Sequence, residues 1–84
     1  MSAFTEALEP LRRRMERVKL PESFVRELLV PNSTIHLNEA AMRWAGMPNK
    51  NERAAMHEVL AALADAGFLE PEGEEHWRVL RAAD

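Results

Sequence analysis

The feature that most constrains the fold is a long amphipathic helix pattern that stops at Gly67 and is followed at once by two apolar residues. The inward face of this helix is formed by Met56, Val59, Leu60 and Leu63. Glycine readily adopts the left-handed conformation that ends a helix, so Phe68 and Leu69 are expected to fold back onto that face. A return strand through Trp77 and Val79 would cover the same core, because a two-stranded hairpin is marginal without helices behind it.

The remaining elements are separated by proline, glycine and capping residues. Asn49 with Glu52 three positions later matches a capping box, which predicts a helix start. We expect helices over 10–19, 21–30, 39–45 (capped by Asn38) and 50–66, strands over 34–37, 68–70 and 76–80, and a turn over 71–74. The pattern indicates a mainly α fold with a small β-hairpin.

The N-terminal segment has a regular apolar seam at spacings of 4, 3, 4 and 3. The seam consists of Phe4, Leu8, Leu11, Met15 and Val18. Pro10 either kinks this helix or begins it, and we favour the second alternative because proline is well tolerated in the first turn. The seam fits packing on the chain's own core, and it fits a homodimer equally well.

The chain of 84 residues has room for one core. It contains no cysteine, so it has neither a disulfide framework nor a thiolate metal site. No apolar run approaches the roughly 18 residues of a membrane span, and no secretion signal is visible. We therefore expect a cytoplasmic protein that does not associate with membranes. The initial Met fits a complete short product, while membership of a larger replication protein stays open.

From Pro21 onward, the expected order is helix, strand, helix, helix, strand, strand. The stretch from Leu63 to Leu69 follows the pattern Leu-x-x-x-Gly-Φ-Φ, where Φ is apolar. Together these features resemble the winged helix-turn-helix family over about residues 21–81, without identifying a subfamily. The resemblance implies a winged helix domain over 21–84 with an extra N-terminal helix over 1–20, used for packing or dimerisation.

The resemblance also implies binding to double-stranded DNA by a small regulator of transcription, with the helix from Asn49 as recognition helix. The candidate DNA contacts are Asn49, Lys50, Asn51, Arg53, His57 and Arg78. Asparagine pairs with adenine, and arginine or lysine pairs with guanine. The alternative is a well-capped, solvated helix terminus, and Glu58 and Asp65 on the same outward face would repel phosphate.

The charge distribution supports a second hypothesis. Net charge is −3, and residues 70–76 contain four acids and no lysine or arginine, which does not suit a wing on a phosphate backbone. The chain would then be a protein–protein interaction module, such as a small phage or plasmid factor that binds replication, transcription or defence machinery. Candidate contacts to a partner or to phosphate are Glu72, Glu74 and Glu75 in the wing, and Arg12, Arg13 and Arg17 in the N-terminal helix. The simpler interpretation of the helix is a solvated face with Glu9–Arg13 and Arg12–Glu16 pairs.

Enzyme chemistry has little support in the sequence. There is no glycine-rich phosphate loop, no nucleophile elbow and no assignable pair of carboxylates. His36, His57 and His76 fall on three different elements. Trp44 and Trp77 are expected to be core residues. We expect no catalytic residue, no metal and no cofactor.

Overall fold

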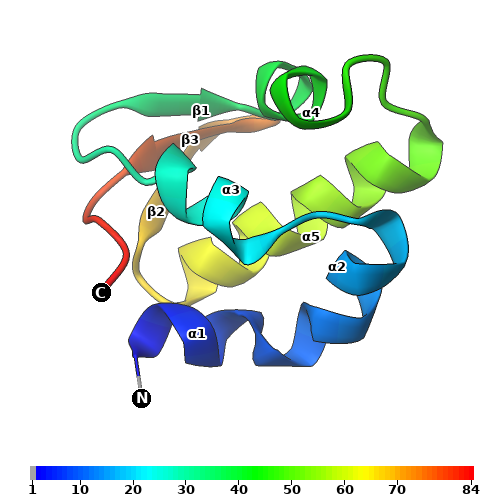
Figure 1. Cartoon of the computed structure of the whole chain (residues 1–84). Coiled ribbons are helices and arrows are strands. Elements are labelled where there is room, and N and C mark those ends of the chain that lie inside the picture. Colours follow the sequence, from blue (N-terminus) through cyan, green and yellow to red (C-terminus); the bar gives the residue numbers. More distant parts are fainter. Residues whose placement is uncertain (1) are drawn as a thin grey trace.

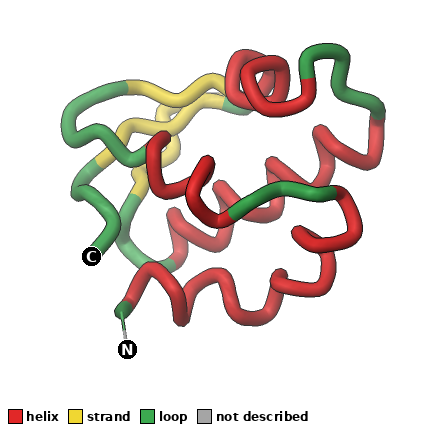
Figure 2. The backbone as a smooth tube through the Cα atoms, in the orientation of Figure 1, coloured by secondary structure: helices red, strands yellow, loops and turns green. Residues whose placement is uncertain are grey.

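The computed structural model describes residues 2–84 and is mainly helical, with a small antiparallel sheet (Figure 1, Figure 2). Its elements are α1 (Ala3–Leu8), the 3-10 turn η1 (Glu9–Leu11), α2 (Arg12–Val18), α3 (Glu22–Leu28), β1 (Thr34–His36), α4 (Leu37–Ala45), α5 (Lys50–Asp65), β2 (Leu69–Gly73) and β3 (His76–Val79). The three strands are ordered β1-β3-β2. The predicted fold class of helices with a small hairpin is confirmed, and β1 joins the hairpin as a third strand.

The end of α5 has the predicted geometry. Gly67 is left-handed, with φ +88°. The N–H of Phe68 donates to the carbonyl of Leu63 at 2.9 Å, and that of Gly67 donates to Ala64 at 3.1 Å. These two bonds form a Schellman ending, which satisfies carbonyls that the helix itself leaves free. The chain therefore reverses tightly enough for Phe68 to be fully buried.

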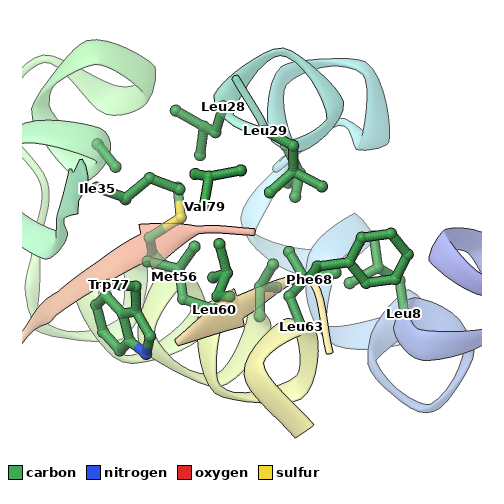
Figure 3. Close-up of a cluster of buried hydrophobic side chains, with 14 of the residues drawn as sticks. Leu8, Leu28, Leu29, Ile35, Met56, Leu60, Leu63, Phe68, Trp77 and Val79 are labelled. Carbon is green, nitrogen blue, oxygen red and sulfur yellow. The ribbon is translucent and has the colours of Figure 1, made fainter. Parts of the chain in front are cut away.

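The core lies between α5 and the inner face of the sheet (Figure 3). The inward residues of α5 predicted from the sequence, Met56, Val59, Leu60 and Leu63, are all buried. Trp77 and Val79 of β3 point into the same cluster, while Leu28 and Leu29 close it from the end of α3. Each fully buried aliphatic side chain of this kind stabilises the fold by about 1.5–3 kcal/mol, so this cluster is the main source of stability.

The N-terminal segment is helical on both sides of Pro10. The expected helix from Pro10 is preceded by α1, and the proline lies in η1, where the chain bends. Of the apolar seam, Phe4, Leu8 and Met15 are buried, and Leu11 and Val18 pack against the same core. The apolar seam therefore packs on the core of its own chain. A homodimer through these side chains would require this core to open.

The C-terminus holds the start of α1. The backbone N–H groups of Ala3 and Phe4 donate to the Asp84 carboxylate at 3.0 and 2.9 Å. Arg26 of α3 donates to the Asp84 backbone carbonyl at 3.0 Å. The bonds from Phe4 and Ala3 lower the pKa of Asp84 below its ordinary value of 3.8, and the charge of Arg81 lowers it further.

The start of α4 differs from the prediction. The helix begins at Leu37, directly after β1, and its N-cap is His36 where the sequence suggested Asn38. The N–H of Leu37 donates to the carbonyl of Glu75 in the hairpin turn at 2.9 Å. A backbone carbonyl from another element thus satisfies a donor at the helix start, and no local side-chain cap is needed.

The hairpin turn is also displaced from its predicted position. Residues 71–73 continue β2, and the turn falls at Glu74 and Glu75. Pro71 is tolerated because β2 is an edge strand, where the missing N–H costs least. The register shifts between Pro71 and Gly73, and Glu75 is left-handed with φ 61°.

Gly67→Ala tests the reversal at the end of α5. A Cβ at this position meets nothing within 4 Å, so the substitution creates no steric clash. Alanine in the left-handed conformation destabilises the folded state by about 1–2 kcal/mol. Part of this loss is offset because alanine restricts the unfolded chain more than glycine does. We expect the free energy of unfolding in urea to fall by about 1 kcal/mol. Gly73→Ala is the matched control, because its Cβ would make only an ordinary 3.8 Å contact with His76. If Gly67→Ala unfolds at the same urea concentration as the wild type, Gly67 does not have the left-handed conformation described for the end of α5.

Asp84→Asn tests the contact between the two ends of the chain. Since the folded pKa of Asp84 is lowered, the carboxylate stabilises the fold above its ordinary pKa of 3.8, and this stability is lost as pH falls through the lowered value. The variant should have a lower melting temperature than wild type at neutral pH, and the two should converge in acid. Glu74→Gln, in the exposed hairpin turn, is the control. A difference that stays constant with pH would contradict this assignment.

Candidate functional site

The start of α5 is capped as predicted. The Asn49 side chain accepts a hydrogen bond from the Glu52 N–H at 2.8 Å, and the Glu52 carboxylate accepts one from the Asn49 N–H at 2.8 Å. The Glu52 carboxylate and the side-chain oxygen of Asn49 are therefore used within the helix. Lys50 and Asn51 are exposed beside them in the first turn.

One exposed strip of α5 contains most of the predicted DNA contacts. Lys50, Arg53, Ala54 and His57 are all exposed there. Arg53 donates to the carbonyl of Pro48 at 2.8 Å, which anchors its guanidinium at the turn before α5. His57 makes an edge contact with Trp77, with ring centroids 5.5 Å apart. This strip thus presents two cations and an imidazole with only a small residue between them.

The basic run of α2 lies next to this end of α5 (Figure 1). Arg14 of α2 and Glu58 of α5 form an ion pair at 3.1 Å. A depression of about 470 Å³ lies between the two helices, lined by Arg14, Arg17, Val18, Lys19, Asn49, Asn51 and Glu52. The structure therefore brings together two groups of candidates that are far apart in the sequence. Arg14 and Lys19 were not among the predicted site residues, because only the packing of α2 on α5 places them here.

The cations of α2 divide into two groups. Arg12 bonds to Glu9 at 2.8 Å and Glu22 at 3.0 Å, and these hydrogen bonds raise its pKa. Arg12 therefore ties α2 to α3, and the expected pairs Glu9–Arg13 and Arg12–Glu16 do not form. Within residues 2–84, Arg13 and Arg17 make no ion pair.

Arg78 is not placed with the other predicted contacts. Trp77 points toward α5, and side chains alternate along a strand, so Arg78 lies on the opposite face of the sheet. There it pairs with Glu70 across the hairpin at 2.6 Å, and this hydrogen bond raises the pKa of Arg78. Its guanidinium is already engaged and faces away from the exposed strip of α5.

The acidic hairpin is short and attached to the body of the protein. Glu72, Glu74 and Glu75 are exposed. Because the turn is tied to α4 through the carbonyl of Glu75, it does not project as a free arm. The acids gather beside the start of α4, and the α2 cations gather beside the start of α5.

Two exposed methionines, one in α4 and one in the following turn, were not anticipated. Met47 is 93% exposed and Met42 is 57% exposed. They line a depression of about 630 Å³ together with Asn38, Gly46, Pro48 and Arg53. Met42 also borders a second depression that contains His36, Asn38, Glu39, Glu75 and His76. A partly apolar surface thus runs from the hairpin turn to the turn before α5.

The histidines are closer together than their sequence positions suggest. His36 and His76 are opposite each other in the β1–β3 register, with ring centroids 4.4 Å apart. No group of three or more metal-ligating side chains occurs in the part of the chain that the structure describes. Among residues 2–84, no helix is both long and apolar enough to cross a bilayer.

Comparison of the chain with protein-family models, with curated proteins and with solved structures gives no match.

Proposed function

We propose that this chain is a winged helix domain that binds double-stranded DNA, with α5 as the recognition helix. The helices and strands from α3 to β3 follow one another in the order that the winged helix resemblance implies. The observation that carries the proposal is the exposed strip in the first half of α5, which contains Lys50, Arg53 and His57. The first turn of the same helix borders the α2 cations through Asn49 and Asn51. Such a helix end suits entry into a major groove.

The acidic side chains of α5, which the sequence suggests would repel phosphate, are paired or distant from Lys50 in the folded protein. Glu58 was expected to repel phosphate, but its carboxylate pairs with Arg14. Glu52 is held in the capping box. Asp65 lies at the far end of α5 from Lys50. The net charge of −3 is therefore compatible with a locally positive surface around Lys50 and Arg53.

Replacing both Lys50 and Arg53 with alanine tests the proposal. A good contact to a base edge contributes about 1–3 kcal/mol, so we expect affinity for duplex DNA to fall at least about tenfold, measured by fluorescence anisotropy at low salt. Arg43→Ala with Arg81→Ala is the control, since it removes equal charge from other surfaces and should change affinity far less. Unchanged affinity in the Lys50/Arg53 variant, or no binding by the wild type, would contradict the proposal.

A second candidate function is binding to a basic protein partner. The observation that favours it is the surface where exposed Met42 and Met47 continue into the acidic hairpin turn at Glu75. Methionine is flexible and polarisable, which suits it to adaptable protein contacts. A partner segment with lysine or arginine beside an apolar residue would match this surface.

Changing Glu72, Glu74 and Glu75 to lysine distinguishes the two functions. If the hairpin binds a basic protein, this reversal should abolish capture of that partner in a pull-down, because like charges then face each other. If α5 binds DNA, the same variant should retain DNA affinity or gain some. Retained capture of the partner would rule out the hairpin as its docking surface.

A further inference from the structure

The exposed cations of α2 have no role in the fold described so far. Arg13, Arg17 and Lys19, here called the α2 basic face, are all exposed. We infer that the α2 basic face, and not the hairpin, contacts the phosphate backbone beside the groove that α5 enters. This inference depends on the proposed function, and it assigns the DNA-backbone contacts to a different element of the same protein.

The position of α2 is the first argument. The Arg14–Glu58 ion pair at 3.1 Å ties α2 to α5, and the last turn of α2 lies at the same end of the molecule as the first turn of α5 (Figure 1). Arg17 borders both the depression between the helices and a second one that also includes Arg13 and Glu16. A sugar–phosphate strand flanking the groove at α5 would pass over this surface.

The ion pairs of α2 are the second argument. Arg12 and Arg14 are paired, which accounts for their places in the fold. None of the residues of the α2 basic face forms an ion pair with an acid in residues 2–84, although Glu16 lies between Arg13 and Arg17. Unpaired guanidinium and ammonium groups around a polar depression are the groups that bind phosphodiester oxygens.

Lys19 supplies a third and independent argument. It ends α2 in the left-handed conformation, with φ 61°, at a position where glycine would be conformationally easier. Its carbonyl accepts a hydrogen bond from the Trp44 indole N–H at 3.0 Å, an interaction that does not need a lysine side chain. The cation is therefore not explained by the fold, and it lies at the rim of the depression beside α5.

The hairpin cannot make the same contacts. Its exposed side chains include Glu72, Glu74 and Glu75, and its one arginine is paired with Glu70. A phosphate strand at this surface would be repelled. Of α2 and the hairpin, which both border α5, only α2 therefore carries exposed cations that could contact phosphate.

The salt dependence of DNA affinity tests this assignment. Removing one cation that binds a phosphate should reduce the slope of log affinity against log salt by about 0.9. We expect Arg13→Gln with Arg17→Gln and Lys19→Gly to lower this slope by about 2–3 on any duplex sequence. The Arg43→Ala with Arg81→Ala variant should keep the wild-type slope.

A matched pair of single variants separates folding from binding. Lys19→Gly and Glu75→Gly both relieve a left-handed residue at φ 61°, so both should raise the melting temperature. Only Lys19→Gly should weaken DNA binding, and it should lower the slope of log affinity against log salt by about 1.

The outcomes distinguish this inference from the function on which it depends. If the triple variant keeps the wild-type slope while the Lys50/Arg53 variant binds DNA more weakly, the α2 assignment is wrong and DNA binding by α5 stands. If the slope of the control variant falls as far as that of the triple variant, the effect is one of total charge and the assignment is also wrong. If the wild type does not bind DNA, the inference and the proposed function both fail.

Discussion

Packing of α5 between the sheet and the N-terminal helices is the interaction on which the rest of the structure depends. The inward face of α5 is buried by Trp77 and Val79 of β3, and a second side is covered by α1 and α2. Only one strip of the helix then stays accessible. The candidate interface is therefore a consequence of core packing: the residues that hold the fold together also decide which side chains of α5 face solvent.

The same packing separates the charges of an acidic protein. Pairing of α2 with α5 collects cations at the start of α5, while the tie between the hairpin turn and α4 gathers carboxylates beside the start of α4. A net charge of −3 hides this separation. An uneven field of this kind would orient the molecule on a polyanion before close contacts form, with α2 and α5 leading.

Local signals predicted the elements whose geometry is decided locally. The Gly67 reversal and the amphipathic face of α5 were predicted correctly because helix periodicity and capping depend on neighbouring residues. The start of α4 was missed because the Leu37 N–H bonds to Glu75, a residue far along the chain. The Arg14–Glu58 ion pair depends on how α2 packs against α5. Residue spacing along one helix does not specify this packing, so the α2 side of the candidate site could not be predicted from the sequence.

A backbone amide NMR titration of the isotope-labelled chain with a short DNA duplex is the most direct test of DNA binding by α5 and α2. We expect the shifted resonances to cluster on the last turn of α2 and the first two turns of α5, with the hairpin turn unaffected. Shifts confined to the hairpin and the Met42–Met47 surface, or no shifts at all, would contradict it.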